Sequence, residues 1–190
     1  RHIAERHGAD PARIYIAGLS AGASMALIAA QAYPELFAAA GAHSGLPMGA
    51  AHDRVSAVVA MQRGGSGLRP AAPVPTIIFH GSADHVVNPR NGRLIALRAL
   101  EPFPRLGRTE TAGQVPEGRA YVRTVHRVGR GRPWVEQWTV TGSGHAWSGG
   151  SPAGRFTDPT GPDASAEMLR FFLRHKTSAR RRARGRSSAD

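Results

Sequence analysis

The sequence contains no cysteine. This absence excludes disulfide bonds, thiolate metal sites and a cysteine nucleophile from these 190 residues. Long hydrophobic runs are also missing, because no apolar stretch approaches the ~20 residues that a membrane-spanning helix needs. Since 41% of the residues are hydrophobic and 20% are charged, the composition is that of a globular domain with a real core, not of a disordered chain or a membrane protein.

Metal and nucleotide sites are not indicated either. The histidines lack the spacing of metal ligands, no cluster of carboxylates occurs, and the sequence of a phosphate-binding loop is absent. We therefore expect no metal and no cofactor.

Positive charge is in excess, with a formal net charge of +12. Residues 178–190, SARRRARGRSSAD, carry five arginines and one aspartate. Such a run can bind nucleic acid or acidic surfaces through phosphate contacts, but a basic terminus is more often a solvated, disordered tail. We favour the tail and expect no specific nucleic-acid partner and no membrane partner.

Predicted strands alternate with predicted helices along the chain. The clearest strand is 74–79, VPTIIF, whose continuous apolar run is typical of a parallel strand covered on both faces. Another strand is predicted at 13–17, and 37–42 is either a strand or a helical turn. Helices are predicted at 1–8, 20–32, 53–62, 89–100 and 163–175, a β-hairpin at 121–128 and 134–140, and loops at 64–73 and 101–118. This order predicts an α/β fold with a mainly parallel sheet of four or five strands.

A serine lies between two glycines where a strand is predicted to become a helix. The segment Gly18-Leu19-Ser20-Ala21-Gly22 fits the G-x-S-x-G pattern of a nucleophile elbow. There the serine adopts a strained conformation, its hydroxyl is lifted above the sheet edge, and we expect both flanking glycines to be needed to avoid collisions. The backbone N–H of Ala21 would stabilise negative charge at the helix N-terminus. The alternative is an ordinary N-cap serine.

An acid and a base follow the serine in the order that this architecture requires. Asp84 comes just after the strand at 74–79, and His145 lies in a glycine-rich loop after the strand at 134–140. The sequence therefore predicts a Ser20–His145–Asp84 triad. Competing candidates are the acids Asp53, Asp158 and Asp163 and the bases His80, His85 and His126. We expect His80 to make a structural hydrogen bond and His85 to point away from Asp84.

Longer stretches extend these motifs, namely GLSAGASMA, HSGLPMGAA, PTIIFHGSADHVVNPRNG and GSGHAWSGGSPAGRFTDPTGPDASAEMLRFF. Up to about His175 the chain resembles the polyhydroxybutyrate depolymerase family of esterases, which is related to feruloyl and acetylxylan esterases. The resemblance implies an α/β-hydrolase fold, with Ser20 as nucleophile, Asp84 as acid and His145 as base. It also implies Trp147 as a wall of the substrate pocket, for which an aromatic packed in the core is an equal alternative.

The resemblance also bears on domain organisation. It implies that residues 1–176 are the C-terminal portion of one catalytic domain and that 177–190 are a basic, disordered tail. Family members carry a preceding segment with the first strands of the sheet and a loop that gives a second oxyanion donor. We therefore expect a fragment in which the nucleophile strand has an unpaired edge and catalysis is impaired.

Three functions remain open from the sequence. The first is a serine esterase acting on short-chain hydroxyalkanoate esters of the polyhydroxybutyrate type, and a serine peptidase is a remoter variant of this chemistry. The second is a carbohydrate esterase that removes acetyl or feruloyl groups. The third, of another class, is a catalytically impaired fragment or a basic binding module. Because family members are often exported, we expect an extracellular protein.

Overall fold

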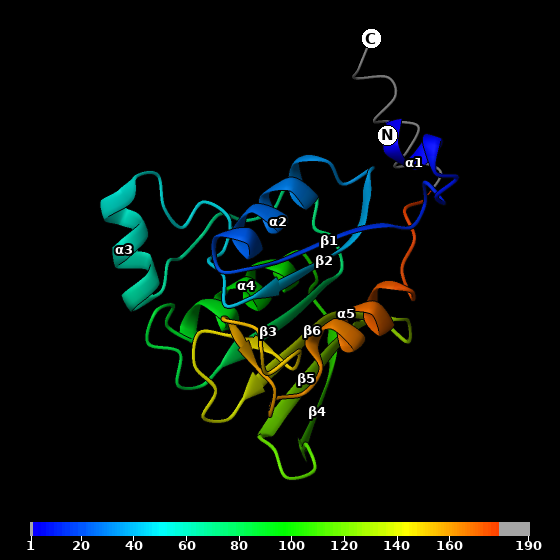
Figure 1. Cartoon of the computed structure of the whole chain (residues 1–190). Helices are drawn as coiled ribbons and strands as arrows, with labels where there is room; N and C mark the ends of the chain where they lie inside the picture. Colours follow the sequence, from blue (N-terminus) through cyan, green and yellow to red (C-terminus); the bar gives the residue numbers. More distant parts are fainter. Residues whose placement is uncertain (1, 179–190) are drawn as a thin grey trace.

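A six-stranded sheet organises the part of the chain that the structure, a computed structural model, describes, which is residues 2–178 (Figure 1). Its strands lie in the order β1-β2-β3-β6-β5-β4. Neighbours from β1 to β6 are parallel, and the last two pairings are antiparallel. The strands are β1 (Ile14–Leu19), β2 (Phe37–His43), β3 (Thr76–Gly81), β4 (Leu106–Gln114), β5 (Ala120–Val128) and β6 (Pro133–Val140).

Helices cover both faces of this sheet. The helices of the described residues are α1 (His2–Arg6), α2 (Ala21–Ala32), α3 (Arg54–Arg63), α4 (Arg90–Leu100) and α5 (Ala164–Phe172), and of these α2, α4 and α5 pack on the sheet. On one face α2 and α4 pack against a cluster that includes Ile78, and on the other face α5 packs against a cluster that includes Ile77 and Phe79. Successive residues of β3 therefore enter opposite cores, which is why this strand is apolar throughout. The predicted α/β-hydrolase type of fold is confirmed in this mainly parallel sheet.

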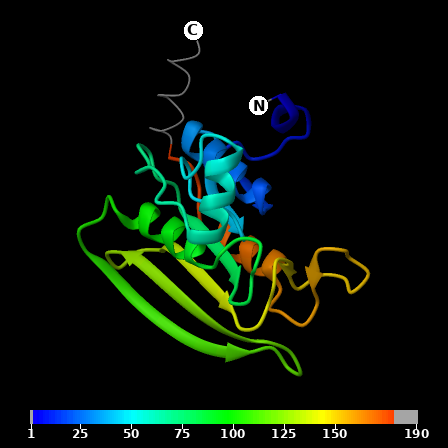
Figure 2. The ribbon, with the colours of Figure 1, turned by 90° about the vertical axis from the view of Figure 1, so that its left-hand side faces the viewer.

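One predicted loop is a strand. Segment 101–118 was expected to be irregular, but β4 pairs with β5 over nine residue pairs, and both form a long ribbon at the lower edge of Figure 2. Most β4 side chains are exposed, so the sequence carries no alternation of buried and exposed positions. The strand exists because β5 offers its free edge, and its polar residues suit a position at the edge of the sheet. The prediction of four or five strands was too low.

The other uncertain segments have definite structures. Residues 37–43 form a strand, and the predicted hairpin is confirmed in β5 and β6. A small two-stranded sheet, β7 (Trp147–Ser148) and β8 (Thr157–Asp158), lies between β6 and α5.

The two ends of the described chain meet. The backbone N–H of Thr177 donates to the carbonyl of Ala12 over 2.9 Å. Strand β1 is the edge strand on this side of the sheet, and within the described residues its only neighbour in the sheet is β2. The predicted arginine-rich tail lies outside the described residues from 179 onward. Across residues 2–178, no helix has the length and apolarity to cross a membrane.

Candidate active site

Four neighbouring parallel strands end at one edge of the sheet. Ser20 follows β1, Ser44 follows β2, Asp84 comes shortly after β3, and His145 lies in the loop after β6. Because parallel strands point the same way, their carboxyl ends bring these loops together. The edge therefore collects the three residues that the sequence predicted for catalysis.

The turn at Ser20 has the geometry of a nucleophile elbow. Ser20 has a φ of 58° and a ψ of −122°, and its side chain makes no capping hydrogen bond to α2. An added Cβ at Gly18 would lie 2.4 Å from the carbonyl carbon of Gly22. The N-cap interpretation is therefore wrong, and the need for a glycine at position 18 is explained.

The second glycine of the motif behaves differently. An added Cβ at Gly22 would meet no atom within 4 Å. The expectation that both glycines avoid collisions is thus wrong for Gly22 among the described residues, because a side chain added there would enter open space.

Acid and base are in direct contact. The Nδ1 of His145 lies 2.9 Å from Oδ2 of Asp84, although the two residues belong to loops after different strands. The Asp84 side chain is fully buried, whereas that of His145 is 15% exposed. If Nδ1 donates its proton to the carboxylate, the lone pair of Nε2 is left free to accept a proton from a nucleophile.

Several donors converge on the Asp84 carboxylate. Its Oδ1 accepts the backbone N–H groups of Val86, at 3.0 Å, and Val87, at 2.8 Å. Desolvation by burial would raise the pKa of Asp84, but hydrogen bonds from His80, Val87, His145 and Ser44 outweigh it and hold this pKa well below its ordinary value. Asp84 is therefore a fixed negative charge at neutral pH.

The loop that carries His145 is tied down on both sides. Before it, the Ser143 hydroxyl donates to Asp158 over 2.6 Å, and Arg119 also pairs with this carboxylate. After it, the Ser148 hydroxyl donates to the carbonyl of Pro162 over 2.7 Å. These anchors hold the imidazole at the sheet edge and assign Asp158 a structural task.

The other competing candidates have structural or exposed positions, and His80 among them borders the site, with its Nε2 3.4 Å from Oδ2 of Asp84. Asp53 and Asp163 accept backbone N–H groups as the N-caps of α3 and α5. His85 is exposed beside the buried Asp84, and His126 lies on β5. His80 is buried, and its Nε2 lies 2.8 Å from the carbonyl of Val87, which is the structural hydrogen bond that we expected.

The predicted nucleophile and the predicted base are not hydrogen-bonded to each other. Within the described residues, no hydrogen bond joins the Ser20 hydroxyl to the His145 imidazole. In unliganded enzymes such bonds are often long and tighten only with substrate. The structure thus joins acid to base and places the serine at the same edge, and the third contact stays a prediction.

Two residues at this edge were missed by sequence analysis. His43, at the end of β2, lies with its Nδ1 3.1 Å from the Ser44 hydroxyl, and its Nε2 lies 3.0 Å from the backbone nitrogen of Ser148. Burial, helped by the positive potential of His80, lowers the pKa of His43 to about 3. The signal in the sequence was a histidine and a serine directly after the apolar run at 37–42.

Trp147 lies beside this network. Its ring stacks on His43 with centroids 5.3 Å apart, and its indole N–H donates to the Ser165 hydroxyl over 3.1 Å. The indole is thus held by one stacking contact and one hydrogen bond, and it is half-buried. Its role as a pocket wall stays a prediction.

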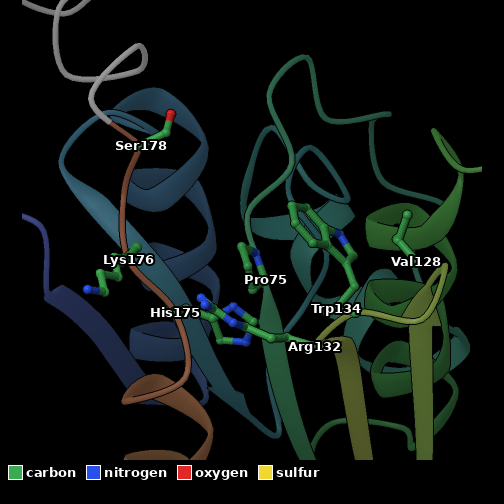
Figure 3. Close-up of a pocket in the computed structure, with 9 residues that line it drawn as sticks. Pro75, Val128, Arg132, Trp134, His175, Lys176 and Ser178 are labelled. Carbon is green, nitrogen blue, oxygen red and sulfur yellow. The ribbon is translucent and has the colours of Figure 1, made fainter.

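A cavity of about 460 Å³ lies at the opposite edge of the sheet (Figure 3). Its walls come from the amino ends of strands and from the chain after α5, and include Pro75, Trp134 and His175. None of the predicted triad residues lines it. The cavity is therefore separate from the candidate active site. Elsewhere in residues 2–178, no group of three or more potential metal ligands is found.

Comparisons with known sequences relate the chain to a family of esterases. The model of the family described as "Esterase PHB depolymerase" matches residues 1–101, a range that contains Ser20 and Asp84. Poly(3-hydroxyalkanoate) depolymerase C of Paucimonas lemoignei is 34% identical over 155 residues, which covers 73% of this chain and 36% of that protein. Acetylxylan esterase A of Aspergillus awamori is 32% identical over 109 residues, or 45% of this chain and 34% of that protein. The chain thus spans about a third of the length of these curated relatives.

Solved structures support the fold. The acetyl xylan esterase from Aspergillus awamori matches with a TM-score of 0.59 and 22% identity, over 90% of this chain and 62% of that chain. A PHB depolymerase in complex with an R3HB trimer matches with a TM-score of 0.51 and 16% identity, over 86% of this chain and 52% of that chain. At such identities the likeness concerns the fold alone.

Proposed function

The chain belongs to the PHB depolymerase family of esterases, and from this premise we propose that it is part of a serine esterase that cleaves carboxylic esters through an acyl-enzyme. The observation that carries the proposal is the 2.9 Å contact between His145 and Asp84 at the edge where Ser20 occupies a strained turn. A helix cap or a loop-stabilising pair would need neither this order of residues nor this turn.

In the proposed mechanism the residues act in sequence. The Nε2 of His145 takes the proton from the Ser20 hydroxyl while the serine oxygen attacks the ester carbonyl. Asp84 holds the imidazole by its Nδ1–H and stabilises the imidazolium. The imidazolium then gives its proton to the leaving alcohol, and water attacks the acyl-serine by the same base catalysis, which regenerates the hydroxyl and releases the acid.

The oxyanion of the tetrahedral intermediate needs donors. Ala21 is the first residue of α2, and N–H groups in the first turn of a helix have no intrahelical acceptor. Its N–H therefore suits the oxyanion, and the helix dipole adds to the stabilisation.

For the substrate we favour esters of hydroxyalkanoic acids, including their polymers. In the sequence comparison, the poly(3-hydroxyalkanoate) depolymerase match covers 73% of this chain, whereas the acetylxylan esterase match covers 45% of it. Removal of acetyl groups from xylan is the second candidate. Rates on a hydroxybutyrate oligomer and on acetylated xylan, measured side by side, decide between them.

Because both polymers are too large to enter a cell, we also propose that the protein acts outside it, which fractionation of a culture tests.

The test of the reaction class is covalent labelling. An active-serine phosphonate should label the protein at one residue, and Ser20→Ala should abolish the label. Ser24→Ala, a change of the nearby serine whose hydroxyl accepts the Leu46 N–H, is the matched control and should be labelled normally. Label that persists in Ser20→Ala would overturn the assignment.

A further inference from the structure

The triad acid is flanked by a buried serine that the proposed mechanism does not use. Ser44 is 1% exposed and has a φ of 52°, a left-handed conformation that is uncommon for a residue with a side chain. Its backbone N–H donates to the carbonyl of Phe79 on β3 over 3.0 Å. This bond holds the serine between the ends of β2 and β3, next to the loop that carries Asp84.

The direction of the hydrogen bonds around His43 can be deduced. The backbone N–H of Ser148 can only donate, so Nε2 of His43 accepts and carries no proton. A neutral imidazole then carries its proton on Nδ1, which lies 3.1 Å from the Ser44 hydroxyl. Since the pKa of His43 is lowered to about 3, the ring is neutral at all pH values of interest.

The hydroxyl proton of Ser44 is therefore free to be donated. Its oxygen accepts from His43, so the proton must point to another acceptor. We infer that the acceptor is the Asp84 carboxylate, because Ser44 is held between the ends of β2 and β3 and its side chain is among the hydrogen-bonding groups that lower the pKa of this acid.

We propose that Ser44 is a positioning residue for Asp84, and that His43 fixes the direction in which it donates. The hydrogen bonds then run in one direction, from Ser148 to His43, to Ser44 and to the carboxylate. His145 donates to the same carboxylate from the other side. Since Ser148 and His145 belong to one loop, the chain of bonds closes a ring that couples the position of the base to that of the acid. The inference rests on the proposed function in taking Asp84 as the triad acid.

The expected effect of this donor follows from electrostatics. By donating a hydrogen bond, the Ser44 hydroxyl stabilises the negative charge of Asp84. Without this donor the carboxylate is more basic, and it stabilises the His145 imidazolium more strongly. Other titratable groups that face this carboxylate are His80 from β3 and His43 from β2, and Asp158 acts on His43 from a distance. A substitution at position 44 leaves His80 in place, whereas His43 loses the acceptor of its Nδ1–H.

The decisive variant is Ser44→Gly, because glycine adopts the positive φ without strain and removes only the hydroxymethyl group. We expect the acid limb of the pH profile of kcat/KM to move up by about one pH unit, the size of one hydrogen bond to a charged group. Activity should fall about tenfold on the acid side, recover on the alkaline plateau, and leave KM unchanged. A merely structural serine would lower activity equally at every pH.

The matched control is Thr76→Val, at the amino end of β3. It also removes a buried hydroxyl, one that donates to the Val74 carbonyl over 2.9 Å, but far from the carboxylate. It should lower thermal stability without moving the acid limb. A profile of Ser44→Gly that matches this control would overturn the proposal.

A measurement that needs no turnover separates this inference from the proposed function. Nitrogen NMR of the wild-type histidines should identify His43 as neutral and protonated on Nδ1 down to pH 4. In Ser44→Gly the low-field proton between His145 and Asp84 should move further downfield, since the carboxylate becomes a stronger acceptor. A His43 protonated on Nε2 overturns the relay even if the enzyme is active. Conversely, the expected spectra without ester hydrolysis would sink only the function.

Discussion

The histidines at the carboxyl edge of the sheet have very different neighbours from the histidine at the amino edge. At the carboxyl edge, His145 and Ser44 both face the Asp84 carboxylate, and His43 sets the direction in which the Ser44 hydroxyl donates. At the amino edge, His175 lines a cavity with Arg132 and Lys176 but with no carboxylate, and its Nε2 has no hydrogen-bond partner among the described residues (Figure 3).

This contrast shows which feature makes a buried histidine a catalytic candidate. Burial lowers the pKa of His175 to about 4, and Arg132 and Arg174 add to this effect. Burial also lowers that of His43. Desolvation alone therefore yields a neutral imidazole at either edge. Only a neighbouring fixed negative charge, as at Asp84, can orient an imidazole and stabilise it once it has taken a proton.

The largest expected effect tests this comparison at its centre. Asp84→Asn removes the charge but keeps the shape, and we expect kcat to fall by about 10⁴-fold, as in other triads with this change. Steady-state kinetics on a soluble ester measures it.

The control for this change lies at the other edge. His175→Asn should leave kcat within about twofold, because a change remote from the reacting groups does not alter transition-state binding. Comparable losses from both substitutions would mean that the wrong edge has been assigned.

The next effect is on stability, and it depends on the packing of the turn around Ser20 at the carboxyl edge. Gly18→Ala places a Cβ 2.4 Å from the backbone of Gly22, so we expect a loss of about 3 kcal/mol in the free energy of unfolding. Gly22→Ala meets nothing within 4 Å and should be neutral or stabilising by up to about 1 kcal/mol. Chemical denaturation of both variants gives the two values. An equal loss at both positions would contradict the packing of the turn.

A smaller loss of stability is expected from His175, at the amino edge, when the pH is lowered. The unfolded state protonates His175 near pH 6.5, whereas the folded state does so only near pH 4, so unfolding takes up a proton in between. Stability is therefore retained above pH 6.5 and lost as the pH falls towards 4. By pH 5 the loss from His175 should amount to about 2 kcal/mol.

Replacement by an aromatic residue isolates this contribution. His175→Phe has no titrating group, so its free energy of unfolding should depend less on pH between 8 and 5 than that of the wild type. His43 still titrates in the variant, with a folded pKa of about 3, so part of the dependence should persist. An unchanged pH dependence would show that His175 is not the buried neutral group described above.

Much of the carboxyl edge could be predicted from the sequence, because its signals are local. The apolar run of β3 followed by Asp84, and the strand–turn–helix around Ser20, are each contained in a dozen residues. The order of motifs grouped Asp84 and His145 in the predicted triad, and in the structure Nδ1 of His145 lies 2.9 Å from Oδ2 of Asp84.

What could not be predicted depends on contacts between distant segments. The strand β4 carries mostly exposed side chains and exists through its pairing with β5. The approach of Ser44 to Asp84 depends on how β2 and β3 end side by side, with the Ser44 N–H on the carbonyl of Phe79. A pattern read along the chain contains neither relation.

The most direct test of the central claim is a crystal structure of the protein with an active-serine phosphonate. The account predicts a covalent bond from the Ser20 oxygen to phosphorus, with His145 Nε2 within hydrogen-bond distance of the adduct and Nδ1 still on Asp84. An adduct on another residue, or an imidazole turned away from a modified Ser20, would contradict it.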